Sequence, residues 1–172
     1  IPMLREKKKY KLEKLFTAKI LWGILMTKIK YVFLTHQFYD DYKNCIQIEQ
    51  KQDRPYVQLV VKIDELYFAL PFRSNISHEF AFWTDKDNKC GIDYSKAVVI
   101  MDSKYIDTEA KPQIRQNEHA SIIGSEHLIE KGFKAYLKTY KKALRKQEVN
   151  RNRVICQFSA LQYFHDEMRI EL

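Results

Sequence analysis

Residues 54–78 of this 172-residue chain, RPYVQLVVKIDELYFALPFRSNISH, contain the pattern that decides the expected fold. Two runs of β-branched, aromatic and other apolar side chains, 56–63 and 66–72, are separated only by the acidic pair Asp64 and Glu65. Apolar runs with so short a polar break are typical of two antiparallel strands joined in a hairpin. The sequence therefore predicts a β-hairpin in this stretch.

A cluster of polar side chains follows directly after the predicted hairpin. Its guanidinium, hydroxyl, amide and imidazole groups are suited to binding a phosphate and to transferring a proton near neutral pH. The same residue types also occur as surface ion pairs, turn caps and ordinary loop histidines, and the sequence leaves these alternatives open. The cluster consists of Arg73, Ser74, Asn75, Ser77 and His78.

The rest of the chain combines short apolar strands with a few helices. A long helix is predicted after Ser125, because apolar residues recur every three or four positions from Ile129 to Leu144. Thr35 and Ser159 are predicted to cap two shorter helices. These elements predict a single compact α+β domain, with a strongly bent, mostly antiparallel β-sheet core flanked by helices. Further strands are expected at 30–34, 79–83 and 97–101, a loop at 91–94, and an extended or turn-rich segment at 105–118.

The composition excludes a disordered chain and suggests contact with a polyanion. Hydrophobic residues make up 45% of the chain and aromatic residues 13%, which is enough for a folded core. The net charge of +8 is concentrated in two blocks: residues 1–30 hold nine Lys or Arg and two Glu, and residues 131–153 hold nine and one. Basic blocks on a weakly acidic body favour nucleic-acid binding, although the second block could equally be the solvated face of a helix.

The cysteines and the first residues carry predictions about compartment and domain boundary. Cys45, Cys90 and Cys156 have neither metal-ligand spacing nor a CxxC pair, which is typical of thiols in a reducing compartment. No apolar run reaches the roughly 20 residues that a membrane span needs, so we expect a cytoplasmic protein without membrane contact. Residues 1–27 fit the pattern poorly, despite a spacing that would suit an amphipathic helix, and are expected to lie outside the native domain at 28–172.

Four segments together resemble the toxins of type III toxin–antitoxin systems, the ToxN/AbiQ family, and most closely its TenpN-like branch. They are the hairpin with its RPY and PFRS ends, GIDYSKAVVI at 91–100, KPQIRQNE at 111–118, and CQFSALQYFH at 156–165. The resemblance implies an endoribonuclease that needs no metal or other cofactor and leaves a 2′,3′-cyclic phosphate. It also implies two RNA partners: a cognate repeat RNA antitoxin, held in a toxin–RNA hetero-oligomer, and cellular or phage RNA as the substrate.

The resemblance also assigns catalytic roles, with departures from the family pattern. The family has an active-site lysine where the first hairpin strand begins, and this position is Arg54 here. Its Thr-Ser pair after the second strand becomes Arg73 and Ser74, and its second lysine falls on Ile76. We therefore expect Arg54 and Arg73 to stabilise the transition state, Ser74 to donate a hydrogen bond to phosphate, and His78 to act as acid or base.

Further residues are expected to contribute to catalysis or RNA binding. Tyr39 lies next to the position where the family has an active-site tyrosine, although strict alignment puts Phe38 there. His36 and Lys96 could face the RNA, but a helix-start surface residue and a plain strand-end lysine are the simpler interpretations. A polar loop and one helix face complete the predicted RNA contacts: Arg115, Gln116, Asn117, Lys134, Lys138, Lys141, Lys142 and Arg145.

Two other functions stay open at this point. The basic and polar residues could belong to an RNA-binding module without catalysis, in which the arginines and the helix face only bind phosphates. Asp85 and Asp87 could instead seed a metal-dependent nuclease. A third carboxylate at suitable spacing is missing from the sequence, so a charged turn explains this pair more simply, and we expect no metal.

Overall fold

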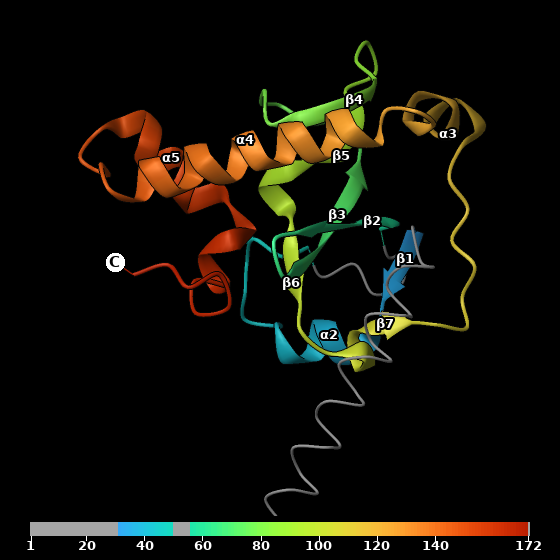
Figure 1. Cartoon of the computed structure of the whole chain (residues 1–172), viewed down its shortest axis with the longest axis horizontal. Helices are drawn as coiled ribbons and strands as arrows, with labels where there is room; N and C mark the ends of the chain where they lie inside the picture. The colour runs from blue at the N-terminus through green and yellow to red at the C-terminus, as the bar shows by residue number, and fades with distance from the viewer. Residues whose placement is uncertain (1–30, 50–55, 172) are drawn as a thin grey trace, which may run out of the picture. The chain divides into compact units, whose positions relative to one another are not determined.

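The computed structural model describes residues 31–49 and 56–171, and a β-hairpin lies at the centre of its sheet (Figure 1). Strands β2 (Gln58–Ile63) and β3 (Leu66–Arg73) pair antiparallel along their length. The acidic pair forms the turn between them. Asp64 has a φ of 52° there, a left-handed conformation that Asp adopts more readily than most residues. The predicted hairpin is confirmed.

The hairpin belongs to an open, seven-stranded antiparallel sheet. The other strands are β1 (Tyr31–Leu34), β4 (Ala81–Asp85), β5 (Cys90–Asp93), β6 (Val98–Ile100) and β7 (Ile106–Asp107). Their order is β4-β5-β3-β2-β1-β7, and β6 pairs with β3 as well. One edge of β3 pairs with β2, while its other edge pairs in turn with β6 and β5. With the helices described next, this sheet confirms the predicted single compact α+β domain.

Between β5 and β6 the chain leaves the sheet as a short 3-10 turn, η1 (Tyr94–Lys96). Strand β5 pairs with Phe72 of β3, and β6 pairs with Ala69. The turn therefore lies opposite the interval between these two residues, which contains Pro71. Proline has no N–H to donate to a ladder, so a break in pairing costs little there. This detour brings the side chains of η1 close to the end of β3.

Helices cover the sheet and close the core. They are α2 (His36–Asp41), α3 (Gln116–Ile122), α4 (Glu126–Leu144) and α5 (Asn150–Phe158), with 3-10 turns η2 (Ser103–Tyr105) and η3 (Ala160–Tyr163). The apolar face of α4 lies against the sheet (Figure 1), where the ring centroids of Phe133 and Phe68 are 5.0 Å apart. Thr35 caps α2 as predicted, because its hydroxyl oxygen accepts from the Phe38 N–H.

Three local predictions were wrong. Residues 91–94 are not a loop, because all but the last belong to β5. Gly91 permits this pairing: a Cβ at that position would lie 2.3 Å from the carbonyl oxygen of Phe82 in β4. The segment expected to be extended contains α3 from residue 116 onward. Ser159 caps the 3-10 turn η3, through a hydrogen bond from the Leu161 N–H, and not an α-helix.

Further predictions concern membrane contact, the state of the cysteines and the N-terminal residues. No helix among residues 31–49 and 56–171 is long and apolar enough to cross a membrane. Cys45, Cys90 and Cys156 are all free thiols. The predicted extension 1–27 and the predicted catalytic residue Arg54 lie outside the described residues.

Candidate active site

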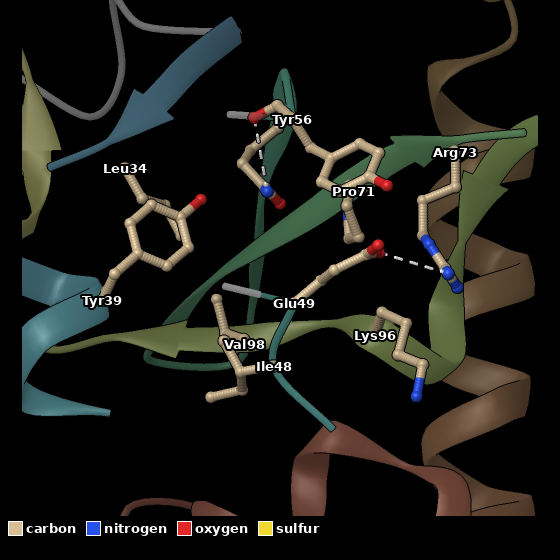
Figure 2. A pocket seen from close by; sticks show the side chains of 10 residues that line it. Leu34, Tyr39, Ile48, Glu49, Tyr56, Pro71, Arg73, Lys96 and Val98 are labelled. Atoms are coloured by element: carbon tan, nitrogen blue, oxygen red, sulfur yellow. Dashed lines mark hydrogen bonds and ion pairs between the residues drawn. The ribbon is translucent and has the colours of Figure 1, made fainter. Parts of the chain in front are cut away.

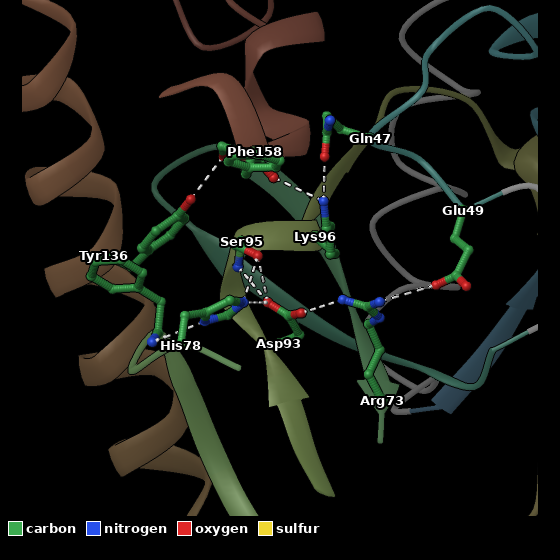
Figure 3. A network of polar contacts seen from close by, with 11 residues as sticks. Gln47, Glu49, Arg73, His78, Asp93, Ser95, Lys96, Tyr136 and Phe158 are labelled. Carbon is green, nitrogen blue, oxygen red and sulfur yellow. Dashed lines mark hydrogen bonds and ion pairs between the residues drawn. The ribbon is translucent and has the colours of Figure 1, made fainter. Parts of the chain in front are cut away.

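An ion-paired cluster forms where β3 ends and η1 begins (Figure 3). Arg73, the last residue of β3, donates from Nη1 to Asp93 Oδ2 at 2.6 Å, and its Nη2 lies 3.3 Å from Glu49 Oε2. The Asp93 side chain has no exposed surface. A charge buried this deeply is stable only when it is paired and hydrogen-bonded. The Arg73–Asp93 ion pair is therefore a structural requirement at this place in the fold.

Asp93 connects the cluster to η1. Its Oδ1 accepts hydrogen bonds from the Ser95 N–H at 2.9 Å and from the Ser95 hydroxyl at 2.7 Å. Burial alone would raise the pKa of Asp93, but the contacts from His78, Ser95 and Arg73 outweigh burial and lower that pKa. Asp93 is therefore a carboxylate at neutral pH, and it holds both Arg73 and the first turn of η1 in position.

His78 is held by both of its ring nitrogens. Nδ1 accepts from the Phe80 N–H at 3.2 Å, so a neutral ring carries its proton on Nε2. Nε2 lies 3.1 Å from the Ser95 hydroxyl oxygen and 3.4 Å from Asp93 Oδ1. In this orientation neither nitrogen is free to exchange a proton with a ligand. His78 must turn about its side-chain bonds before it can act as an acid or base.

The neighbouring serine is not built as a nucleophile. The Ser95 hydroxyl donates its proton to Asp93 and accepts from the His78 ring, so the histidine cannot remove that proton. Ser95 is also only 6% exposed. A serine nucleophile needs an adjacent base and open access to substrate. The Asp93–Ser95–His78 chain therefore orients side chains and does not form a catalytic triad.

Lys96 joins three separate parts of the chain. Its ammonium nitrogen donates to Gln47 Oε1 at 2.6 Å and to the Phe158 carbonyl oxygen at 2.8 Å. Burial lowers the pKa of Lys96; Asp93 and Glu49 oppose this shift, and Arg73 adds to it. A lysine ammonium group has three N–H donors. These two hydrogen bonds use two of them and leave the third for a ligand. Lys96 is therefore the cluster's best-placed proton donor.

Three hollows surround Arg73. The one beside His78, Ser95 and Lys96 has a volume of about 420 Å³, and its lining also includes aromatic and aliphatic side chains from α4 and α5. A second hollow of about 570 Å³ lies beside Ser74. The third, with Glu49 at its edge, holds only about 20 Å³ (Figure 2), which is room for a water molecule and not for a nucleotide. The first hollow combines polar groups with a ligand-sized volume.

The predicted catalytic residues are only partly brought together. Arg73 and His78 line the same pocket, together with Lys96, which was predicted to bind RNA. Ser74 is exposed and faces the second hollow, which it shares with Arg115. Tyr39 is buried at 3% exposure beside the small cavity; burial first, and then Glu49 and Tyr56, raise its pKa to about 12. A tyrosine in that state is a poor proton donor at neutral pH.

The remaining predicted RNA-binding residues lie on other surfaces. His36 is exposed at the start of α2 and lines none of the three hollows around Arg73. Gln116 and Asn117 are exposed in the first turn of α3. The basic face of α4 is exposed throughout, and none of its five members forms an ion pair with another described residue: Lys134, Lys138, Lys141, Lys142 and Arg145.

The acidic pair considered as a metal site forms a turn. Both carboxylate oxygens of Asp85 accept from Asn88, at 3.1 Å from its backbone N–H and 2.7 Å from its side-chain amide. In the described part of the chain, no three His, Cys, Asp or Glu side chains gather closely enough to hold a metal ion. Asp85 thus has the role of a turn cap, and Asp87 is exposed beside it.

The sequence interpretation missed Asp93, Ser95 and Glu49. The spacing of Asp93 and Ser95 is the signature of an Asx turn, in which an aspartate accepts from the backbone two residues later. This signal begins inside the segment predicted as a loop, 91–94. Glu49 offered no local signal, because its contact with Arg73 depends on the tertiary fold.

Comparison of the chain with protein-family models, with curated proteins and with solved structures finds no match.

Proposed function

We propose that this chain is a metal-independent endoribonuclease, the toxin of a type III toxin–antitoxin system. It would cleave single-stranded RNA by attack of the 2′-oxygen on the adjacent phosphorus, leaving a 2′,3′-cyclic phosphate. One observation carries the proposal: Arg73 and Lys96 line one pocket, where the buried carboxylate of Asp93 orients Arg73 and contacts with Gln47 and Phe158 hold Lys96. Cleavage by this route needs a base that takes the proton of the 2′-hydroxyl, charge stabilisation at phosphorus, and a proton for the leaving 5′-oxygen.

Arg73 is the group that stabilises the phosphorane. Two of its nitrogens are fixed by carboxylates, and its Nε is buried without an acceptor in the described part of the chain, so Arg73 would act on the phosphorane through its positive charge. Ion pairs on both sides lock the guanidinium plane, which favours stabilisation of a defined transition-state charge. The roles of Ser74 and Tyr39 in catalysis are less well supported, since one faces another hollow and the other is buried.

Lys96 supplies the proton to the leaving oxygen. A depressed pKa brings a lysine closer to the value that a general acid needs at neutral pH, and burial acts on Lys96 in this direction. His78 is the second proton-transfer group in the proposal. It can take part once its ring has exchanged the Phe80 N–H for a substrate hydroxyl.

The binding energy for RNA would come from outside this cluster. Arg73 and Lys96 carry two positive charges, and Asp93 and Glu49 carry two negative ones, so the cluster is formally neutral. Long-range attraction of a polyanion requires an excess of positive charge. The exposed basic face of α4 has that excess, and we assign to it the repeat RNA antitoxin of a toxin–RNA hetero-oligomer. The proposal includes a cytoplasmic location, which three free thiols support.

A second candidate function is a non-catalytic RNA-binding module. The engagement of both His78 nitrogens favours it, because no base stands ready in the pocket. The basic face of α4 would then bind phosphates alone. This alternative requires the arrangement around Asp93 to be purely structural.

Incubation with short single-stranded RNA in excess chelator separates the candidates. Cleavage that leaves a 2′,3′-cyclic phosphate supports the ribonuclease, tight binding without cleavage supports the module, and cleavage that chelator abolishes supports a metal-dependent nuclease. Arg73→Met should abolish cleavage. Lys62→Met is the matched control, because Lys62 lies at the far end of the hairpin and pairs on the surface with Glu65.

A further inference from the structure

The pocket beside Lys96 has an apolar wall that the reaction itself does not require. Phe158, the last residue of α5, lines it with 52% of its surface exposed, and Val154 lines it with 44% exposed. Residues four apart lie on the same face of a helix. Two exposed apolar side chains on one face, both at the mouth of one pocket, form a surface suited to a flat apolar ligand.

The rest of this wall is rigid. The Tyr136 hydroxyl donates to the buried Ser159 hydroxyl oxygen at 2.8 Å, and the ring of Tyr136 lies 5.2 Å from that of Phe80. The Phe158 carbonyl oxygen accepts from Lys96. This contact holds the Lys96 amine against the backbone of Phe158, at the end of α5 (Figure 3). A ligand that stacks on Phe158 would have its neighbouring atoms beside Lys96.

We propose that this wall is a subsite for one unpaired nucleobase next to the scissile phosphate, stacked on Phe158. The proposal rests on the proposed ribonuclease function and names the substrate group that the pocket selects. An aromatic face accepts any base, whereas Arg73 and Lys96, which line the same pocket, suit a phosphate. A paired base cannot reach such a surface, so the subsite selects single-stranded RNA.

We assign to Asn75 the reading of the edge of that base. It lines the same pocket, is exposed, and has a φ of 58°. An asparagine amide can donate to and accept from a base edge at once. Glycine adopts the same left-handed backbone without strain. Asn75→Gly therefore removes the amide while leaving the loop conformation intact.

The test uses a short single-stranded 2′-O-methyl RNA that carries 2-aminopurine at each position in turn. This oligonucleotide cannot be cleaved, so stacking is measured separately from catalysis. We expect one position to show quenched fluorescence with the wild-type protein and with Phe158→Tyr, which keeps the ring. Phe158→Leu should lose the quenching and weaken binding by roughly 5- to 150-fold, the effect of one lost base stack. Asn75→Gly should reduce the preference among bases at that position.

Each outcome separates the subsite from the proposed function. Phe158→Leu with unchanged quenching, affinity and kcat/KM would overturn the subsite while leaving the ribonuclease standing. Quenching by a wild-type protein that never cleaves RNA would retain the subsite and reject the ribonuclease. Because the Phe158 ring is half exposed, we expect the melting temperature of Phe158→Leu to match the wild type. A lower value would place the ring in the core and overturn the subsite.

Discussion

Replacing Asp93 with asparagine tests whether the buried carboxylate organises the site. Asparagine keeps the size of the side chain and one acceptor oxygen, but it removes the charge that pairs with Arg73. Breaking one partner of a buried pair typically costs about 3–5 kcal/mol, and Arg73 would keep only its longer contact with Glu49 at 3.3 Å. For a domain of this size, such a loss corresponds to a fall in melting temperature of roughly 6–20 °C.

The pH dependence of this effect has a defined sign. The pKa of Asp93 is lower in the folded protein than in the unfolded chain. The ionised carboxylate therefore contributes its full stabilisation above the unfolded-state pKa of about 3.9. This stabilisation is lost as the pH falls through the folded-state pKa. Asp93→Asn lacks this contribution. The difference in unfolding free energy between wild type and variant should therefore stay constant from about pH 8 to 5 and shrink below about pH 4.

Chemical denaturation at several pH values, followed by circular dichroism, measures both quantities. Asp64→Asn is the matched control, since Asp64 is exposed in the hairpin turn and asparagine accepts its left-handed backbone equally well. We expect the control to leave the unfolding free energy unchanged. An Asp93→Asn variant within about 1 kcal/mol of wild type, or one whose deficit ignores pH, would show that the carboxylate does not hold Arg73 by charge.

Three further perturbations test catalysis and RNA binding. Lys96→Met should reduce cleavage by roughly 10²- to 10⁴-fold. Lys96→Arg should restore it only partly, because the guanidinium stays protonated. Equal cleavage rates in the wild type and both variants would show that Lys96 is not the general acid. His78→Ala should reduce cleavage by a similar factor while RNA binding persists. Cleavage at a near wild-type rate would show that His78 only orients Ser95 and transfers no proton. Replacing Lys138, Lys141 and Lys142 together with Gln should flatten the dependence of log affinity for repeat RNA on log salt by about two to three units. An unchanged slope there would leave this face of α4 as solvated surface.

The elements that the sequence predicted well are those whose signal is local. The hairpin follows from two apolar runs with a two-residue break, and the buried face of α4 follows from the spacing of Ile129, Phe133 and Tyr136. In both cases the residues that interact lie within one turn of helix or across one tight turn. Neighbours along the chain then decide the structure almost unaided.

Strand β5 and the polar cluster needed the tertiary structure. The residues of β5, CGID, carry little strand preference of their own, and the strand exists because β3 and β4 supply hydrogen-bond partners on both edges. Glu49, Arg73, Asp93 and Phe158 meet only after strand register and the packing of α5 have been set. The sequence alone thus determined which chemical groups are available. Only the fold decided which of them meet, because side chains distant along the chain interact where backbone pairing brings them within hydrogen-bond reach.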